Sequence, residues 1–538
     1  MGKKVRNKIE HKIYKIMNPK FIFLSLVLIL LSFKTSYQSD YLVTDYGIIG
    51  DAKTLNTENI QNLIDQVSKN GGGKIIFPAG KFLSGSIELK DEIELYFEAG
   101  AVLLGSKNPF DYKKVVSKDT LSTRHNTALI SAHLRNNVKI TGYGTVNGQG
   151  GYLALALDSL YYADPDSYFK ISRSYNERRK RPNEGGRPNL IFLNQSKNIQ
   201  IKGVTLKNGA EWVTRIELCD SVVIDNIKLE SDVYWNNDGI DLVDSKNVRI
   251  TNSDINAADD AICFKSHHKF SYCENIYVSN CKIRSSASAV KFGTASHGGF
   301  KNIELNNLNI YDTYRSAIAL EAVDGGFIDG VKVSNIKAVN TGNAIFIKLG
   351  HRNAPGVVGS LQNVEIKNID VTVPKEIPDK DYEIRGPMLP FFHNKFPSSI
   401  TGIPGYYVKN VSIENVVIRY PGGGNQAYAN MPTWRMEGVP ENKESYPEFS
   451  MFGELPAWGL YVRHVSGLNL KNIRLEANEA DYRPSIVLDD VNNSNLSALQ
   501  IKGEGYPKQI VVKDVKNIKI ITDEEVEIIG KNSGIELK

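Results

Sequence analysis

Residues 247–255 read NVRITNSDI, and this alternation of apolar and polar residues returns along the chain. It reappears as NIYVSNCKI from Asn275 and NIELNNLNI from Asn302, and earlier copies start at Asn198 and Ser221. The five successive starts are 23, 26, 28 and 27 residues apart. Apolar alternation is typical of β-strands, and a repeat length in the twenties indicates a solenoid of stacked coils.

The composition of these repeats favours stacked β-coils over leucine-rich repeats. Val, Ile, Thr and Asn predominate, whereas leucine-rich repeats need a denser Leu pattern. Asn suits the corners because it tolerates left-handed backbone angles, and stacked Asn side chains can form amide ladders. Later copies are NVEIKNIDV from Asn363, NVSIENVVI from Asn410 and LNLKNIRL from Leu468. We therefore expect an all-β protein, a right-handed parallel β-helix.

The segments beside the repeats predict a cap and two long loops. Residues 56–70 carry four apolar residues at helical spacing: Ile60, Leu63, Ile64 and Val67. An amphipathic helix there would cover the open N-terminal end of the stack. Residues 374–405 and 420–462 interrupt the repeat and are rich in Pro, Gly and aromatic residues. We expect both to be long loops that line a groove.

The N-terminal segment predicts export. Residues 21–33, FIFLSLVLILLSF, form a 13-residue apolar run behind a basic flank. That run is short for a membrane span and typical of a signal peptide. We expect residues 1–38 to be the signal peptide, with a start at Met1 or Met17. Residues 40–538 would then form a single exported domain, which is periplasmic, on the cell surface or secreted.

The basic net charge comes from the same segment. Residues 1–38 hold eight Lys or Arg residues and one Glu, so the chain's net charge of +5 becomes about −2 for the remainder. The basicity therefore indicates no nucleic acid partner, and we expect no stable membrane insertion after signal cleavage.

The cysteines and histidines predict neither disulfides nor a metal site. Four cysteines are few for a disulfide scaffold of this length, and we expect buried thiols at Cys219, Cys263, Cys273 and Cys281. The sequence has no His/Cys cluster with ligand spacing, so we expect no metal and no cofactor.

Two acidic clusters lie about one repeat apart. The first is NNDGID at 236–241, which contains Asp238, and the second is ADDA at 258–261, which contains Asp259 and Asp260. Carboxylates on neighbouring coils of one groove perturb each other's ionisation and suit acid–base hydrolysis of a glycosidic bond. We expect the nearby Asp241 and Asp244 to be turn formers at corners of the solenoid.

Several stretches resemble one family of carbohydrate-active proteins. Residues 45–106 resemble the start of bacterial pectin-degrading β-helix proteins, and GYGTVNGQG (142–150) resembles the GxGxxDGxG turn of the polygalacturonases, glycoside hydrolase family 28. RPNLIFLNQSKNIQIKGVTLKNGAEW (187–212) resembles the strands that lead into that family's active coils. NNDGID and ADDAICFKS fall where the family carries Asn-x-Asp and Asp-Asp, and the resemblance covers residues 43–480.

The resemblance implies a role for each acid. The family inverts the anomeric configuration by direct attack of water. Asp259 would be the general acid that protonates the leaving oxygen, and Asp238 and Asp260 would hold and deprotonate the water. Asn236, from the Asn-x-Asp motif, would contact the substrate.

Two further motifs of the family are missing. Where polygalacturonases carry Gly-His-Gly, this chain has Ser286-Ala287-Ser288, and Ala317-Ile318-Ala319 stands in place of Arg-Ile-Lys. In the family these residues hold the substrate carboxylate beside the cleaved bond. Either the sugar there lacks that carboxylate, or other basic residues hold it.

Nearby residues are candidates for binding the substrate. We expect Arg315, His351 and Arg352 to do so, because Arg can hold a carboxylate through two parallel bonds and a His-Arg pair leads into a Gly/Pro loop. We expect Lys291, His297 and Lys348 to be solvated charges at the rim.

Aromatic residues near the acids also predict sugar binding. Trp212 and Trp235 precede the acidic clusters, and sugar rings stack on such side chains. In the second long loop Trp434, Trp458, Tyr446, Phe449 and Phe452 would either line the groove or pack the loop onto the coil.

These features favour an exported hydrolase of a pectin-type acidic polysaccharide or its oligosaccharides. Two alternatives stay open: a polysaccharide lyase on the same fold, and a non-catalytic carbohydrate-binding β-helix. The sequence leaves the sugar, the linkage, endo or exo action and the oligomeric state undetermined.

Overall fold

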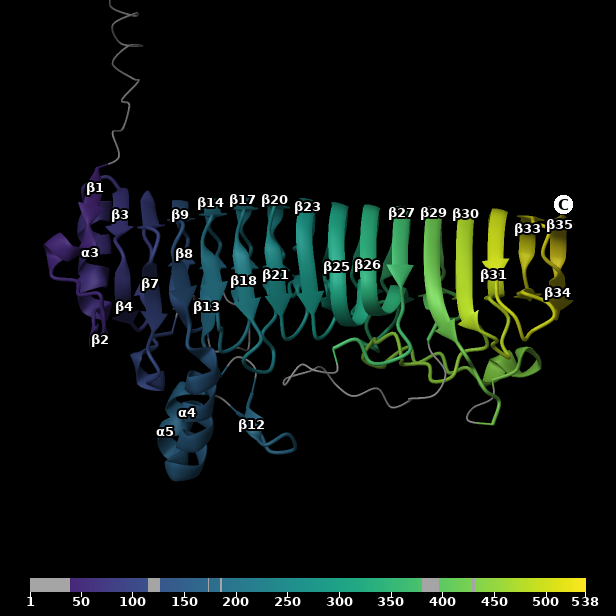
Figure 1. Cartoon of the computed structure of the whole chain (residues 1–538), viewed down its shortest axis with the longest axis horizontal. Helices are drawn as coiled ribbons and strands as arrows, with labels where there is room; N and C mark the ends of the chain where they lie inside the picture. The colour runs from purple at the N-terminus through teal and green to yellow at the C-terminus, as the bar shows by residue number, and fades with distance from the viewer. Residues whose placement is uncertain (1–38, 115–125, 173, 184–185, 380–395, 428–430) are drawn as a thin grey trace, which may run out of the picture. The chain divides into compact units, whose positions relative to one another are not determined.

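The computed structural model describes residues 39–114, 126–172, 174–183, 186–379, 396–427 and 431–538. The predicted signal peptide, residues 1–38, lies outside the described residues. Tyr41–Lys538 forms one compact unit, in which parallel strands wind into successive coils that stack side by side (Figure 1). The prediction of a parallel β-helix is confirmed.

The elements follow the chain in this order. The first are β1 (Asp40–Leu42), η2 (Val43–Tyr46), β2 (Asp51–Leu55), α3 (Thr57–Lys69), β3 (Gly73–Phe77), β4 (Gly80–Ser84), β5 (Ile87–Glu88), β6 (Ile93–Phe97), β7 (Ala101–Gly105) and η3 (Pro109–Asp111). The next are β8 (Ala128–His133), β9 (Asn136–Gly142), β10 (Thr145–Asn147), α4 (Gly150–Ala163), α5 (Pro165–Ile171), β11 (Tyr175–Asn176), β12 (Arg181–Pro182), β13 (Asn189–Asn194), β14 (Lys197–Lys202), β15 (Thr205–Lys207), β16 (Thr214–Glu217), β17 (Asp220–Asp225), β18 (Lys228–Ser231), β19 (Ile240–Val243), β20 (Lys246–Thr251), β21 (Asp254–Ala257) and β22 (Ile262–Ser266). The last are β23 (Cys273–Ser285), β24 (Val290–Ser296), β25 (Gly299–Ala322), β26 (Phe327–Leu349), β27 (Ser360–Thr372), β28 (Ser398–Thr401), β29 (Val408–Gly422), η4 (Thr433–Gly438), β30 (Leu460–Glu479), β31 (Ile486–Lys502), β32 (Ile510–Lys513), β33 (Lys516–Ile521), β34 (Val526–Ile529) and β35 (Ser533–Leu537).

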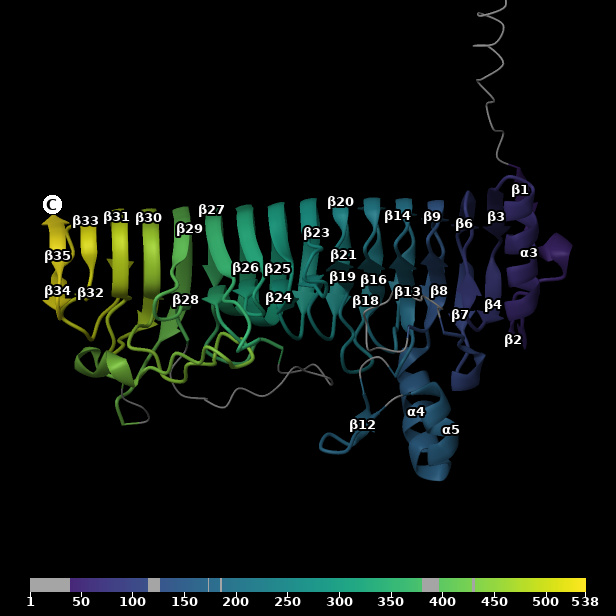
Figure 2. The same ribbon diagram turned by 180° about the vertical axis from the view of Figure 1, so that it is seen from behind.

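The N-terminal cap has the predicted form. Helix α3 buries the four apolar residues that predicted it, and it packs against β3, β5 and β6 at the end of the stack. Gln61 fixes the helix by donating from its amide to the Glu88 carbonyl, 3.0 Å away. Figure 2 shows α3 at the end of the stack, where it covers strands that would otherwise offer unpaired backbone groups.

The corners use Asn as predicted. Asn247, Asn275 and Asn302 have left-handed φ values of 54°, 56° and 53°. Their amides form a ladder, in which Asn275 donates to Asn247 over 3.1 Å and Asn302 donates to Asn275 over 2.7 Å. The repeated Asn therefore sets both the direction of the corner and the alignment of consecutive coils.

One face of the solenoid differs from the rest, and we call it the groove sheet: β8, β13, β16, β19, β22 and β24, continued by parts of β25 and β26. Ile240 and Leu242 point into the core, and Asp241 alternates with them on the outer side. The register places Asp241 between Arg215 and Cys263, with Lys291 one coil further. The outward-facing residues of this sheet are also buried, so they form a second, polar layer outside the apolar core.

Two insertions project from the stack on the same side in both views (Figures 1 and 2). The first holds α4, α5 and the β11–β12 hairpin, which the sequence analysis missed, although Leu153, Ala154 and Leu157 have helical spacing and are buried. The second lies between β29 and β30, within the predicted loop 420–462. The other predicted loop, 374–405, is interrupted by β28, which pairs with β26 and β30 in the stack.

The second insertion packs over the groove sheet. Its residues Met436, Val439, Phe449 and Phe452 form a separate apolar cluster with outer residues of the stack: Ala319, Phe346, Tyr461, Val487 and Val511. Phe449 and Phe452 are therefore buried, whereas Trp434 and Tyr446 stay exposed. Trp458 is also buried, but in the main core of the stack beside Tyr420. The outer face of these coils is filled by protein.

The four cysteines are free and buried, as predicted. Burial raises the pKa of Cys219 to about 12, which keeps its thiol neutral. Among the described residues, helices long and apolar enough to cross a membrane are absent.

Candidate active site

The two acidic clusters meet at the start of neighbouring strands of the groove sheet. Asp238 precedes β19 and Asp260 precedes β22, and the Gly239 amide donates to the Asp260 carbonyl over 2.9 Å. A Cβ on Gly239 would lie 2.4 Å from the Ala261 carbonyl oxygen, so only glycine allows this approach. Asp238 and Asp260 are 4% and 5% exposed, and Asp259 is partly exposed.

A buried amide holds the first cluster in place. Asn237 donates to the carbonyls of Gly209 and Glu211, at 2.9 and 3.0 Å, and accepts from the Tyr234 amide at 3.0 Å. The backbone carbonyl of Asn237 in turn accepts from the Asp259 amide over 3.2 Å. These bonds tie three coils together and fix the acids relative to one another.

Lys265 is the cation at the centre of the acids. Its Nζ lies 2.9 Å from Asp238 Oδ2, donates to Asp241 Oδ1, and lies 4.1 Å from the centre of the Trp212 ring. Although burial disfavours the ammonium, Asp238 and Asp241 hold the pKa of Lys265 well above its usual range. The prediction of Asp241 as a turn former is wrong, since it lies within β19 and pairs with Lys265.

Asp244 does have the predicted corner position. Its φ is 48°, and its carboxylate accepts from the Ser266 hydroxyl and from the amides of His267 and His268. The two residues differ because strand register places Asp241 outward beside a lysine, whereas Asp244 ends the strand.

Three side chains around Lys265 are potential ligands of a metal ion. One oxygen each of Asp238 and Asp260 and the Cys263 sulfur lie within 4.8 Å of one another. Lys265 Nζ lies 3.2 Å from that sulfur and also contacts Asp238, so the ammonium group occupies the position that a metal ion would need. Burial raises the pKa of the Cys263 thiol well above its usual range, which makes it a poor ligand. The donor set fits Lys265 better than a metal.

Lys291 is the counterpart of Lys265 on the next coil. Its Nζ lies 3.4 Å from Asp260 Oδ2 and 3.2 Å from the Tyr446 hydroxyl. The prediction of a solvated rim charge is wrong for Lys291, which is 1% exposed because the second insertion brings Tyr446 over it. The same prediction is wrong for Lys348, which is buried and whose Nζ donates to the Glu441 carbonyl over 3.1 Å. His297 is exposed, as predicted.

Arg315 is held by the second insertion. Its Nη1 lies 2.5 Å from Glu448 Oε1, and Glu448 lies in the segment that folds back over the groove sheet. Burial disfavours the guanidinium, but Glu448, Asp259 and Asp260 raise the pKa of Arg315 above its ordinary value. The predicted residue thus lies beside the acids, already paired with a carboxylate of the same chain.

The acids differ in their ionisation. Burial raises the pKa of Asp238 well above its ordinary value, and the charges of Asp241 and Asp259 add to this effect against the opposing charge of Lys265. Burial also acts on Asp260, but Lys291 and Arg315 outweigh it and lower the pKa of that carboxyl. The cluster therefore favours a proton on Asp238 and a negative charge on Asp260.

Comparison with known proteins gives the family. Residues 68–377 match the family described as glycosyl hydrolases family 28. The chain belongs to this family. A probable polygalacturonase from Vitis vinifera is 28% identical to this chain over 320 residues, which cover 57% of this chain and 56% of that protein. An exo-poly-alpha-D-galacturonosidase from Dickeya chrysanthemi is 27% identical over 362 residues, 59% of this chain and 58% of that protein.

The chain thus spans a little over half the length of these two relatives. A solved exopolygalacturonase from Thermotoga maritima superposes with a TM-score of 0.57 at 23% identity. That superposition covers 71% of this chain and 87% of the other, and it shows a shared fold.

The positions where this family 28 chain departs from the expected motifs are filled by packing. Ala287, Ala317 and Ala319 are buried, and Ala319 lies in the apolar cluster beneath the second insertion. At Ala319 a basic side chain would be buried among apolar residues, because Phe449 and Phe452 belong to the same cluster.

The predicted aromatic and Asn positions lie around Asp238 in different environments. Trp235 is 37% exposed, and the Arg181 guanidinium lies 4.3 Å from its ring centre. Trp212 is 2% exposed and faces Lys265, so it supports the ammonium and offers little surface to a sugar. Asn236 has a left-handed φ of 59°, and its Oδ1 accepts from Arg187 over 2.8 Å.

His351 and Arg352 lie at the second insertion and are engaged with the protein. The His351 ring is 2.6 Å from the Gly356 carbonyl, and its amide donates to the Lys443 carbonyl. Arg352 holds Asp324 through two bonds of 2.8 and 2.6 Å. These contacts hold the loop after β26 in place. Substrate binding by His351 and Arg352 stays a prediction.

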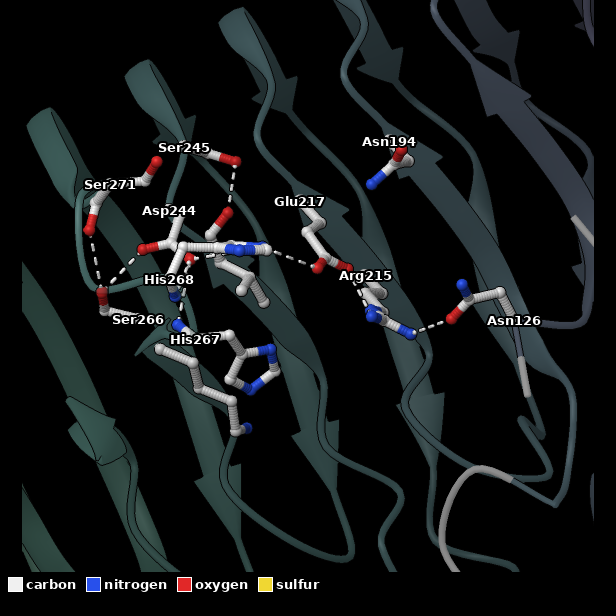
Figure 3. Close-up of polar contacts among 12 residues, drawn as sticks. Asn126, Asn194, Arg215, Glu217, Asp244, Ser245, Ser266, His267, His268 and Ser271 are labelled. Atoms are coloured by element: carbon white, nitrogen blue, oxygen red, sulfur yellow. Dashed lines mark hydrogen bonds and ion pairs between the residues drawn. The ribbon is translucent and has the colours of Figure 1, made fainter. Parts of the chain in front are cut away.

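A second polar network continues the groove sheet towards the N-terminus (Figure 3). Arg215 donates to Glu217 and to Asn126, and His268 Nε2 lies 3.5 Å from Glu217 Oε1. Despite burial, Arg215 and His268 lower the pKa of Glu217 to about 2. Trp212 connects the two networks, because its ring faces both Lys265 and Arg215.

Sequence reasoning missed Lys265, Asp241, Lys291 and Glu448. A signal was present for the first two, because Asp241, Cys263 and Lys265 alternate with core residues on the same outer face. Glu448 had no local signal, since it lies more than a hundred residues from Arg315 in the sequence.

Proposed function

We propose that this protein is an exported glycoside hydrolase that cleaves a pectin-type acidic polysaccharide or its oligosaccharides with inversion at the anomeric carbon. The observation that carries the proposal is the cluster of Asp238, Asp259 and Asp260 on adjacent coils, with Lys265 and Lys291 against its two buried members. Such a cluster places one accessible carboxyl beside two buried ones, which supplies an acid for the leaving oxygen and a site for the attacking water, as inverting hydrolysis requires.

The roles follow from exposure and charge. Asp259 is the most accessible of the three and donates a proton to the leaving oxygen. Asp260, which Lys291 and Arg315 keep ionised, accepts a proton from the attacking water. Asp238 orients the same water, because one oxygen of each buried acid lies within 4.8 Å of the other and a single water can bridge that distance. Asp260 is thus the base of the pair.

The substrate is acidic, but the position beside the cleaved bond does not require a carboxylate. The names of the two relatives, a polygalacturonase and a poly-galacturonosidase, support a galacturonate-containing chain. Lys291 and Arg315, the cations beside the acids, already face Asp260 and Glu448. Rhamnogalacturonan-type oligosaccharides, in which neutral and acidic sugars alternate, therefore rank with homogalacturonan as candidates.

We further propose exo action. The second insertion fills the outer face of the groove sheet from Ala319 onward, one coil beyond Lys291. A polysaccharide lying along the sheet would meet this insertion shortly after the acids, so a chain end is the part that fits.

The test is the Asp259→Asn variant assayed on a panel of pectic oligosaccharides, with the anomer of the first product followed by NMR. We expect wild-type product to be inverted and the variant to lose at least about a hundredfold in kcat, the usual contribution of a general acid. Asp254→Asn, on the neighbouring strand β21, is the control. Wild-type turnover by the Asp259 variant on a confirmed substrate would exclude the assigned acid, and unsaturated products would indicate a lyase.

A further inference from the structure

The first insertion carries a concentrated positive charge. The segment SYNERRKRP, residues 174–182, has four cations and one carboxylate, whereas the chain after residue 38 has a net charge of about −2. Arg178, Arg179 and Lys180 are exposed at the tip of the β11–β12 hairpin. Lys180 pairs with Glu177 over 2.8 Å, and within the described residues Arg178 and Arg179 form no ion pair. Two guanidinium groups are therefore available to an outside anion.

The hairpin is held firmly against α4. The Tyr175 ring stacks on Tyr161 at 3.8 Å with an interplanar angle of 2°, and its hydroxyl donates to Asp158 over 2.5 Å. The strands are joined by register pairs that include Asn176 with Arg181. A charged tip on such a base is preorganised, so less conformational entropy is lost when a ligand binds.

The same hairpin touches the loop that carries Asp238. The Arg181 guanidinium lies 4.3 Å from the Trp235 ring centre, and Trp235 is three residues before Asp238. Arg187, just after the hairpin, donates to the Trp235 carbonyl over 2.6 Å and to Asn236 over 2.8 Å. The hairpin that carries the exposed arginines is therefore in contact with the loop that precedes Asp238 in the candidate active site.

The cations inside the site are in a different state. Lys265, Lys291 and Arg315 are buried, and each faces a carboxylate of this chain. None of these three offers an uncompensated charge to a polyanion, whereas the hairpin tip does.

We propose that the hairpin tip, Arg178 and Arg179 with Lys180, binds carboxylates of an acidic polysaccharide outside the catalytic groove. The ligand class rests on the proposed function, but the binding does not depend on hydrolysis. Tyr162 is 60% exposed and its hydroxyl lies 3.3 Å from that of Tyr175, so a sugar ring can stack beside the arginines. The site recognises charge along the polymer, and the buried site cleaves it.

The test compares the full-length protein with the double variant Arg178→Gln/Arg179→Gln, using sodium polygalacturonate as the probe in titration calorimetry. Lys332→Gln/Lys337→Gln, two exposed cations of β26, is the matched control. We expect the hairpin variant to bind the polymer about 3–10-fold more weakly, with a shallower dependence on salt, as expected for the loss of two exposed ion pairs. The control should match the wild type.

Other results would overturn the proposal. Equal affinity and salt dependence of wild type and hairpin variant would do so, as would an equal loss in the control pair. Binding of anionic vesicles as tightly as polygalacturonate would show a general anion surface instead. If the arginine-dependent binding is present but no pectic substrate is cleaved, the hairpin site stands and the proposed hydrolysis fails.

Discussion

At the residue scale, Lys265 decides how the acids coexist. One buried ammonium lies between Asp238 and Asp241, with Trp212 against its other side. Removing it would leave two carboxylates in an environment that disfavours charge, because their other neighbours, Asp259 and Asp260, are also acidic.

We therefore predict that Lys265→Met destabilises the protein by about 3–5 kcal/mol, the usual cost of leaving buried ion partners unpaired. Its kcat should also fall, since the Asp238 side chain would lose the contact that fixes its orientation. Urea denaturation and steady-state kinetics measure the two effects. Lys337→Met, an exposed lysine, is the control. A change in unfolding free energy no larger than that of the control would refute the role of Lys265.

Glu321 gives the protein a pH dependence of its own. Burial and the charges of Glu448 and Asp260 raise the pKa of Glu321 from 4.5 to about 8, against Lys291. Because the folded state binds this proton more tightly than the unfolded chain, the stabilisation is complete below pH 4.5 and is lost as the pH rises towards 8.

Glu321→Gln mimics the protonated form, so it should escape this loss. We predict that the variant matches the wild type near pH 4.5 and exceeds it near pH 8 by on the order of 1–3 kcal/mol. Urea midpoints at the two pH values measure the difference, with the half-exposed Glu365→Gln as control. A difference that is constant with pH would contradict the raised pKa.

At the scale of the elements, the Asn corners hold the coils in register. Asn302 combines a left-handed φ of 53° with a hydrogen bond from its side-chain amide to Asn275 on the preceding coil. Only Gly, Asn and Asp adopt that conformation readily, and Asn alone also supplies the ladder bond to Asn275.

We predict that Asn302→Ala lowers the unfolding free energy by about 1–2 kcal/mol, the cost of a left-handed conformation for a residue with a Cβ. Asn302→Gly should lose less unfolding free energy, because it removes the side-chain hydrogen bond without adding conformational strain. Thermal and urea unfolding of the pair separates the two contributions. Equal stability of the Ala and Gly variants would show that the backbone conformation contributes nothing.

At the scale of the whole molecule, the second insertion covers part of the groove sheet. It forms its own apolar cluster on the outer face of the stack and contributes Tyr446 and Glu448 to the site. The same segment therefore covers the outer face beyond Lys291 and contacts both Lys291 and Arg315.

We predict that the protein shortens a pectic polymer from its end. The viscosity of the solution should fall slowly relative to the release of reducing ends, and small products should appear from the first time points. Viscometry and chromatography of the same reaction measure both quantities. A rapid fall in viscosity at low release of reducing ends would indicate internal cleavage and a groove open beyond Lys291.

Much of this molecule could be predicted from its sequence, because its order is local. The Asn-terminated repeats predicted the coils, since each corner and each inward-facing residue is set within a single repeat. The apolar face of residues 56–70 predicted α3 for the same reason. The α4 helix was missed because its sequence, rich in Leu, Ala and Tyr, carries no repeat pattern and begins directly at a turn.

The sequence alone determined the β-helix and the meeting of Asp238, Asp259 and Asp260, because a spacing of about one repeat stacks residues on neighbouring coils. Only the tertiary structure decided the electrostatics of the site. Lys291 was expected in solvent and is buried, because Tyr446 reaches it from 155 residues away. Charge pairing and burial depend on what covers a side chain, and the two insertions that do so are set by packing between distant segments.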